Sequence, residues 1–337
     1  MRQILLIESL DNFSPLLRKI KMQATVRASP NIALIKYWGK RDEKNNLPAV
    51  SSISITLDDI WTETKIKFSP NHKSDTLIIN NIQQDNIQRV SDCIDSICGK
   101  ERNFAIVSSE CNFPISAGLA SSSSAFSALV SAINHAVNKG YELQDLANEA
   151  GKASGSAARS MLGGFVELEN KKNKIQINQL LQSEDWPLRV VIAITDSRKK
   201  AVSSSEGMKL SSKTSPFYNS WVKNQSEDID EARKAILSRD FLRLAEISEH
   251  NCMKMHSVMW TSRPSIVYWN SATIECMHAI RELQKKGEFV FFTIDAGPQI
   301  KAVCLPESEP KVINILKEIR GVKSILQSGL GQEPQIK

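Results

Sequence analysis

The chain has 337 residues, of which 41% are hydrophobic and 24% charged, the balance of a globular protein with room for two domains. Its formal net charge of +6 is spread along the sequence without a run of five or more Lys or Arg, so a nucleic-acid-binding tail is not indicated. Aromatic residues make up 6%, too few for a basic face with interleaved aromatics, and no apolar stretch is long enough to cross a bilayer.

The cysteines stand apart from one another, with no CxxC pair and no histidine at zinc-finger spacing. This pattern favours a reducing, cytoplasmic setting in which the thiols act as small buried hydrophobes. At the N-terminus, Glu8 and Asp11 closely follow the short apolar run at residues 4–7, which is unlike a secretory leader. We interpret residues 1–24 as an N-terminal extension.

Periodic patterns predict strands and helices in the first half of the chain. Residues 53–57 alternate apolar and hydroxyl side chains, which predicts a half-buried strand, and residues 62–68 are interpreted as its hairpin partner. Apolar residues at three- and four-residue steps over 126–137 predict an amphipathic helix that Gly140 ends. A second helix is predicted from Leu146 toward Met161.

The second half has the same interleaving of strands and helices. The polar, serine-rich segment 197–215 predicts a loop, and we place the domain boundary there, between 25–196 and 197–337. The mixture of elements predicts an α/β or α+β class. Strands are predicted at 165–168, 190–194, 289–294, 302–305 and 322–326, and helices between 228 and 287 and at 312–319.

The first candidate site is the small-residue segment 114–124, PISAGLASSSS, which leads into the predicted helix. The free N–H groups and the dipole of a helix N-terminus hold phosphate, and serine hydroxyls add hydrogen bonds to phosphate or to the shell of a magnesium ion. The Gly-Lys-Ser/Thr ending of a Walker A loop is absent. Taken alone, a serine-rich helix cap explains this segment equally well.

Three further stretches carry charged side chains at the ends of apolar or small-residue runs. Lys36 and Lys40 flank Tyr37, Trp38 and Gly39, an arrangement that suits a multiply charged ligand but also fits solvated lysines at a strand end. In the segment 154–160, SGSAARS, the guanidinium of Arg159 is a bidentate clamp for carboxylate or phosphate, or a surface arginine. Asp295 ends an apolar strand before Ala-Gly-Pro, where it is a general-base candidate or a turn acid.

Together these stretches resemble the diphosphomevalonate decarboxylases of the GHMP kinase superfamily, in the family's order and spacing. The combination of KYWGKRD, SGSAARS and DAGP is the most specific part of the resemblance. The matching segments are PNIALIKYWGKRD (30–42), SSISITLD (51–58), FPISAGLASSSSAFSAL (113–129), SGSAARSMLGGFV (154–166), VSSSEGM (202–208), MHSVMWTSRPSIVYWN (255–270) and FTIDAGP (292–298).

The resemblance implies an α+β, two-domain fold: an N-terminal ATP-binding domain like domain 2 of ribosomal protein S5, and a ferredoxin-like C-terminal GHMP domain. It also implies the reaction, in which ATP, with Mg²⁺, phosphorylates the C3 hydroxyl of (R)-5-diphosphomevalonate. Loss of phosphate and CO₂ then yields isopentenyl diphosphate in the mevalonate pathway of isoprenoid biosynthesis. Family members are commonly homodimers, so we expect one here.

The resemblance also implies roles for individual residues. Asp295 would orient or deprotonate the C3 hydroxyl, Lys36 would stand beside it, and Arg159 would hold the substrate carboxylate. Ser121 and Ser122 are in addition the implied magnesium contacts. The implied substrate contacts are Tyr37, Lys40, Ser154, Gly155, Ser156, Ser204, Met208 and Ala296, and the implied ATP-binding residues are Gly118, Leu119, Ala120, Ser121, Ser122 and Ser123.

The chain departs from the family pattern at two places. Ala49 and Val50 stand where the family usually has Asn or Thr ahead of the Ser-Ser pair, and Gln299 replaces the Asn common after Asp-Ala-Gly-Pro. The residues that contact adenine, expected within 65–75, are not assigned. The alternatives are a phosphomevalonate decarboxylase or mevalonate 3-kinase-type enzyme, and a non-catalytic GHMP homologue. The presence of Asp295, Lys36 and Arg159 favours full decarboxylation.

Overall fold

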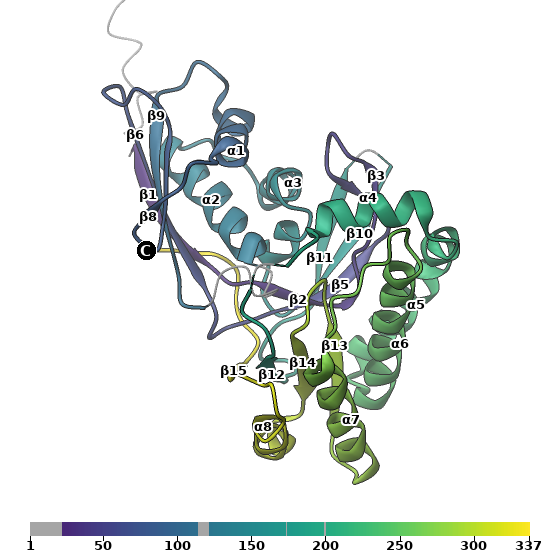
Figure 1. Cartoon of the computed structure of the whole chain (residues 1–337). Coiled ribbons are helices and arrows are strands. Elements are labelled where there is room, and N and C mark those ends of the chain that lie inside the picture. Colours follow the sequence, from purple (N-terminus) through teal and green to yellow (C-terminus); the bar gives the residue numbers. More distant parts are fainter. Residues whose placement is uncertain (1–21, 114–120, 173, 199) are drawn as a thin grey trace, which may run out of the picture.

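The computed structural model describes residues 22–113, 121–172, 174–198 and 200–337. Figure 1 shows an N-terminal half in which α1, α2 and α3 lie together on one side of a sheet, and a C-terminal half in which long helices lie beside another. In the described residues no helix is long and apolar enough to cross a membrane.

The first sheet of the N-terminal half is covered on one face by helices. Its strands, in order, are β16 (Gln335–Ile336), β1 (Gln23–Ala28), β6 (Thr62–Ser69), β9 (Phe104–Cys111), β7 (Thr76–Ile79) and β8 (Ile82–Gln83). Burial alternates along β6, so one face of the sheet meets the helices and the other meets solvent. The helices are α1 (Gln88–Cys98), α2 (Ser121–Val137) and α3 (Leu143–Ala153), and the short 3₁₀ helix η2 (Ala157–Met161) follows them.

The second sheet lies deeper in the molecule, and two of its strands are buried along their whole length. Its order is β11 (Ile175–Leu181), β10 (Phe165–Asn170), β5 (Ser52–Thr56) and β2 (Asn31–Ile35). Both β2 and β5 are buried at every position, which removes the half-exposed face that the alternating sequence predicts for β5. Beyond the edge strand β2, the chain makes the β3 (Lys40–Asp42) and β4 (Leu47–Pro48) hairpin.

The third sheet forms the centre of the C-terminal half. Its order is β13 (Val290–Ile294), β14 (Ile300–Cys304), β12 (Arg189–Ile194) and β15 (Ser324–Ser328). The helices of this half are α4 (Ser204–Thr214), α5 (Tyr218–Ser238), α6 (Phe241–Trp260), α7 (Ser271–Lys285) and α8 (Glu309–Lys317), with the 3₁₀ helix η3 (Pro306–Ser308) before α8.

The two halves share part of their hydrophobic core. Side chains of the second sheet, such as Ile53 and Phe165, belong to the same buried cluster as Val190 and Phe291 of the third sheet. The edge strands β2 and β13 also meet directly, because the Thr293 hydroxyl donates to the carbonyl of Ala33 at 3.3 Å. The ends of these two strands are therefore held next to each other, and residues that follow them lie close together.

Two of the sequence predictions are wrong. The segment 62–68 forms strand β6, but it pairs with β1 and β9 in a different sheet from β5, because alternation identifies a strand without identifying its partner. The predicted loop 197–215 contains the helix α4. Ser203 and Glu206 form a capping box at its start, a local signal that the serine-rich composition obscured.

Other elements differ from the predictions in their limits. The predicted helix from Leu146 toward Met161 is interrupted at residues 154–156, between α3 and η2, and α5 begins ten residues before the predicted start at 228. Strand β12 is an interior strand of the third sheet although it precedes the predicted boundary at 196/197. We therefore propose to place the domain boundary in residues 182–188, just before β12.

Candidate active site

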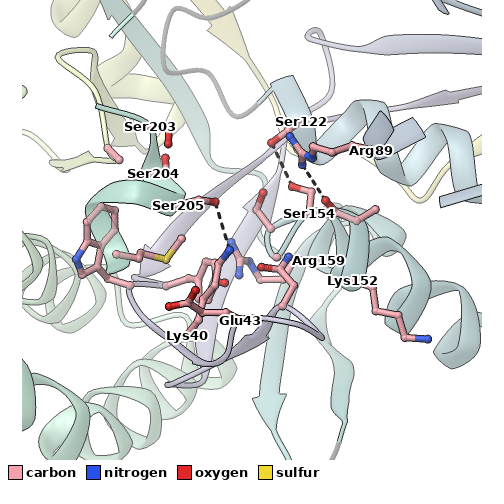
Figure 2. Close-up of a pocket in the computed structure, with 18 of the residues that line it drawn as sticks. Lys40, Glu43, Arg89, Ser122, Lys152, Ser154, Arg159, Ser203, Ser204 and Ser205 are labelled. Carbon is pink, nitrogen blue, oxygen red and sulfur yellow. Dashed lines mark hydrogen bonds between the residues drawn. The ribbon is translucent and has the colours of Figure 1, made fainter. Parts of the chain in front are cut away.

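A cavity of about 940 Å³ lies between the two halves and collects most of the described candidate residues. Its walls come from the segment after β2, the turn between α3 and η2, the start of α4 and the end of β13. Figure 2 shows Lys40, Ser154, Arg159 and Ser204 around this space, although they come from three separate regions of the sequence.

Asp295 lies at the inner end of the cavity between two buried lysines. The Lys36 ammonium donates to Asp295 Oδ1 at 2.7 Å, and the Lys301 ammonium lies 3.0 Å from Oδ2. Each lysine is 1% exposed, whereas the Asp295 side chain keeps 25% of its surface accessible. The carboxylate is thus fixed from behind by both lysines and remains open to a molecule in the cavity.

The electrostatics of this group keep the carboxylate ionised. Burial by itself raises the pKa of Asp295, but the charges of Lys301 and Lys36 and their hydrogen bonds outweigh it and hold this pKa well below its usual range. Burial lowers the pKa of Lys301, and the charge of Asp295 opposes that shift. At neutral pH the site therefore presents an anionic oxygen that is already oriented.

Arg159 lines the same cavity and belongs to a buried polar network. Its Nε donates to Asn31 Oδ1 at 3.2 Å and its Nη1 donates to Ser52 Oγ at 2.7 Å. Asn31 in turn donates to the Ser160 hydroxyl at 2.8 Å and to the Ser156 carbonyl at 2.9 Å. Burial lowers the pKa of Arg159 to about 10, which leaves the guanidinium charged at neutral pH.

Tyr37 and Gly155 approach each other closely on the same wall. A Cβ atom at position 155 would lie 2.5 Å from the Tyr37 hydroxyl, so only glycine leaves this ring in place. The Tyr37 hydroxyl is buried without a hydrogen-bond partner in the described structure, and burial raises its pKa. Since a buried hydroxyl without a partner is costly, this group is available to a polar atom of a bound molecule.

Two further lysines line the cavity. Lys40 donates to the Ser205 hydroxyl at 3.3 Å, and Lys200 donates to the Ser204 hydroxyl at 2.8 Å and to the Ala296 carbonyl at 2.9 Å. Burial lowers the pKa of Lys200, as does the nearby charge of Lys301. Met208, in α4, lines the cavity beside this group.

A second arm of the cavity runs between α1 and α3. Ser121 and Ser122, at the start of α2, line its entrance, and the Ser154 hydroxyl donates to Ser122 Oγ at 3.2 Å. Further out the arm is lined by Arg89, Asp92, Ser96, Glu149 and Lys152. No residue of the segment 65–75, where the adenine contacts are expected, is among the described residues that line this cavity.

The structure brings together the described candidates from the sequence, with few exceptions. Gly118, Leu119 and Ala120 lie outside the described residues, and Ser123 is fully buried in α2 away from the cavity. The candidates that line the cavity are Lys36, Tyr37, Lys40, Ser121, Ser122, Ser154, Gly155, Ser156, Arg159, Ser204, Met208, Asp295 and Ala296.

Sequence reasoning missed Lys301, Lys200, Arg89 and the role of Asn31. Lys301 had a usable signal, because a single lysine inside the apolar strand IKAVC is either buried with a partner or misplaced. Lys200 follows Arg198 in a basic run whose members look equivalent in the sequence. Arg89 lies on α1, whose pattern marks a surface helix and gives no sign of the cavity.

The donor set suits a magnesium ion that is held mainly by phosphate and water. Among the described residues, no group of three or more His, Cys, Asp or Glu side chains is arranged to hold a metal. Magnesium in phosphoryl-transfer sites keeps several waters and takes few protein ligands, and hydroxyls such as those of Ser121 and Ser122 fit that role.

Both halves of the chain match known domain families. The model described as diphosphomevalonate decarboxylase-like N-terminal domain matches residues 28–178, and the model described as mevalonate 5-diphosphate decarboxylase C-terminal domain matches residues 190–335. The fold is the two-domain α+β fold of the GHMP kinase type. The mevalonate diphosphate decarboxylase structure from Staphylococcus aureus superposes with a TM-score of 0.88 at 32% identity, covering 94% of this chain and 98% of that one.

The sequence comparisons agree with the structural ones. The diphosphomevalonate decarboxylase of Saccharomyces cerevisiae is 35% identical over 326 residues, which cover 88% of this chain and 82% of the yeast protein. The diphosphomevalonate decarboxylase of Candida albicans is 32% identical, and the match covers 93% of this chain and 97% of the Candida protein. The Enterococcus faecalis enzyme structure has a TM-score of 0.87 at 32% identity, with 94% and 99% covered. The chain belongs to the diphosphomevalonate decarboxylase family.

Proposed function

We propose that this protein is a diphosphomevalonate decarboxylase, which uses ATP to convert (R)-5-diphosphomevalonate to isopentenyl diphosphate, ADP, phosphate and CO₂. The observation that carries the proposal is the accessible Asp295 carboxylate, fixed by Lys36 and Lys301 in the same cavity as the buried guanidinium of Arg159. An oriented acceptor for a hydroxyl and a fixed cation for a carboxylate are the two groups that this substrate needs.

Asp295 accepts the hydrogen bond of the C3 hydroxyl and aims its oxygen at the γ-phosphorus of ATP. The lysines that lower the pKa of Asp295 also make it a weak base. Phosphoryl transfer has a loose transition state in which the attacking oxygen forms little bond, so the hydroxyl needs orientation more than early loss of its proton. The proton passes to Asp295 as the new O–P bond forms and the bond to ADP breaks.

Arg159 holds the C1 carboxylate during the second step. The C3–O bond to phosphate breaks, and the electron pair of the C1–C2 bond moves to form the C2=C3 double bond as CO₂ leaves. A guanidinium in a buried, hydrogen-bonded network is rigid and supplies two parallel donors to a carboxylate. The step is redox-neutral, because phosphate leaves with the electron pair of the C3–O bond and C3 takes up the pair that CO₂ leaves behind.

The remaining cationic groups suit the two polyphosphates. Lys40 and Lys200, together with the hydroxyls of Tyr37 and Ser204, line the same cavity as Asp295 and offer hydrogen-bond donors to the diphosphate of the substrate and the terminal phosphates of ATP. We place the nucleotide base in the arm between α1 and α3, with Ser121 and Ser122 near the phosphates. A solved relative is described as MDDEF in complex with MVAPP, AMPPCP and magnesium, which supports ATP and Mg²⁺ as the co-substrate and ion here.

We further propose that the protein acts in the cytoplasm and assembles as a homodimer. The described cysteines are all unpaired, which fits a reducing compartment. The dimer is proposed from the family resemblance, and sedimentation at micromolar concentration measures it directly.

The experiment that tests the function measures ADP release from Mg-ATP with mevalonate, its 5-phosphate and its 5-diphosphate in parallel, with CO₂ trapped from each. One CO₂ per ADP from the 5-diphosphate alone is the expected result. Release of ADP without CO₂ would indicate a 3-kinase, and a preference for the 5-phosphate would indicate a phosphomevalonate decarboxylase. No activity on any of the three substrates would indicate a non-catalytic homologue.

A further inference from the structure

Lys36 and Asp295 occupy equivalent places, each one residue beyond the end of an edge strand. Strand β2 ends at Ile35 and β13 at Ile294, and each is the outermost strand of its sheet. An edge strand has ladder partners on one side only, so its free side needs other hydrogen-bond partners when it is buried. Helix α6 supplies such partners to β13 and to Lys36, just beyond the end of β2.

One face of α6 follows the free edge of β13. Glu249 Oε1 accepts from the Phe292 N–H at 3.1 Å, and Cys252 Sγ accepts from the Ile294 N–H at 3.2 Å. His256 Nε2 lies 3.2 Å from the Ile294 carbonyl, to which it donates. Burial lowers the pKa of His256 to about 3, so the ring is neutral and adds no charge beside the lysines.

A neighbouring position on α6 holds the main chain of Lys36. Asn251 Oδ1 accepts from the Lys36 N–H at 2.7 Å, and Gln225 of α5 donates from Nε2 to the Lys36 carbonyl at 2.8 Å. Asn251 Nδ2 donates to Gln225 Oε1 at 2.9 Å. The two amides and the Lys36 backbone therefore form a closed ring of hydrogen bonds.

The ring admits only one orientation of each amide. The Lys36 N–H needs an acceptor and its carbonyl needs a donor, so Asn251 and Gln225 must each present one oxygen and one nitrogen as observed. Asn251 is fully buried and Gln225 is 2% exposed, and neither lines the cavity. Their side chains thus act on the reaction through Lys36 rather than by touching substrate.

We propose that Asn251 is a positioning residue, which with Gln225 seats the Lys36 backbone so that its ammonium meets Asp295. The proposal rests on the proposed function. It makes α6 the common support of the ion pair, since the same helix holds the strand end before Asp295 and the peptide of Lys36. Displacement of a reacting group by about 1 Å costs on the order of 100-fold in rate, which sets the scale of the expected effect.

The test compares Asn251→Ala, Gln225→Ala and the double variant with the wild type, using kcat and KM for Mg-ATP and the 5-diphosphate. We expect each single variant to lower kcat by about 10- to 100-fold, with KM for ATP changed by less than about threefold. In kcat the double variant should be little worse than either single variant, because both break the same ring around Lys36. Asn251 also donates to Asp228, and Gln225 to the Ser51 carbonyl, so the double variant should lose more thermal stability than either single variant.

The matched control is Ser248→Ala, on the same helix. Ser248 is as buried as Asn251, and its hydroxyl has no hydrogen-bond partner in the described structure. Its kcat should stay within twofold of the wild type. Thermal melting of every variant gives the folded fraction. If Asn251→Ala does not fold, Gln225→Ala still tests the ring, because Gln225 belongs to α5 rather than α6.

The pH profile separates positioning from loss of folded protein. The charged and titratable groups that face Asp295 are Lys301, Lys36, Arg159, Lys200, His256 and Cys252. The ring holds Lys36 among them, so its loss should raise the pKa of Asp295 and move the acid limb of kcat to higher pH. A lower kcat with an unmoved acid limb, or unchanged kcat in both single variants, would overturn the proposal.

A readout without turnover keeps the two proposals distinguishable. In ¹³C-aspartate-labelled protein, the Asp295 carboxyl signal is assigned by its loss in Asp295→Asn and titrated in wild type and Asn251→Ala. A higher Asp295 pKa in the variant supports the ring even if the wild type is inactive on every mevalonate tested. An identical titration in both proteins refutes it whatever the activity.

Discussion

At the level of single residues, Asp295 combines a fixed position with an accessible surface, and this combination makes its charge testable. Asp295→Asn removes the charge and retains the shape, so we expect turnover to fall by about 10³-fold or more. The fold should persist because Lys301, whose pKa burial already lowers, is able to release its proton. ADP release and the affinity for a fluorescent ATP analogue check this, and near-normal turnover would remove Asp295 from the mechanism.

Lys301 gives the second prediction at this scale. Lys301→Met keeps most of the side-chain volume but takes one cation from Asp295, so burial raises the pKa of the carboxyl against Lys36 alone. A carboxyl with a depressed pKa is active above that pKa, so raising the pKa moves the acid limb of kcat to higher pH. Kinetics from pH 4 to 8 measure the shift.

The control for that experiment is Lys311→Met, which removes an exposed lysine of α8 that pairs with Glu288 far from the cavity. The pH profile of kcat for this variant should superimpose on that of the wild type. If the acid limb of kcat does not move in Lys301→Met, Lys36 alone keeps the Asp295 carboxyl ionised.

At the level of elements, the sequence predicts where strands end better than what they pair with. The ends of β2 and β13 were predicted from apolar runs that stop at Lys36 and Asp295, because both signals are local. The assignment of β5 and β6 to different sheets depends on pairing with strands that are distant in the sequence, β10 for β5 and β1 and β9 for β6, which alternation does not encode. Lys301 was missed for the same reason, since its partner Asp295 follows a different strand.

The close packing of the turn after α3 against Tyr37 leads to a prediction for this element. Gly155→Ala places a methyl group 2.5 Å from the Tyr37 hydroxyl and 2.8 Å from its ring, which must then shift in the cavity. We expect KM for the 5-diphosphate to rise by about tenfold, whereas nucleotide affinity and thermal stability change little. Steady-state kinetics with each substrate varied separately measure the difference.

Tyr37→Phe in the Gly155→Ala background removes the closest atom of that contact. The double variant should therefore recover part of the loss in KM relative to Gly155→Ala. Absence of any recovery would show that the effect of the methyl group arises elsewhere in the turn.

At the level of the whole molecule, the division into two halves by family and by sheet does not fully separate their cores, although each half also has a cluster of its own. The second sheet and the third sheet contribute to one buried cluster, in which Phe165 stacks on Trp186 at a centroid distance of 5.5 Å. The C-terminal end of the chain also returns to the N-terminal half. There β16 pairs with β1 in the first sheet, and Leu330 forms an isolated β-bridge with Leu57. The C-terminal residues thus complete the N-terminal half.

This shared core predicts that the halves unfold together. With 5-fluorotryptophan incorporated, the ¹⁹F signals of Trp61, which contacts Arg27 in the first sheet, and Trp269, which packs on His256 in the C-terminal half, report each half separately. In urea both signals should pass through one transition with the same midpoint and slope, as for a single cooperative unit.

Separate midpoints would show that each half is stable without the other, and the active site would then lie between two independently folding domains. A common midpoint would mean that substitutions anywhere in the shared core destabilise the placement of both Lys36 and Asp295, because neither edge strand keeps its position without the other half.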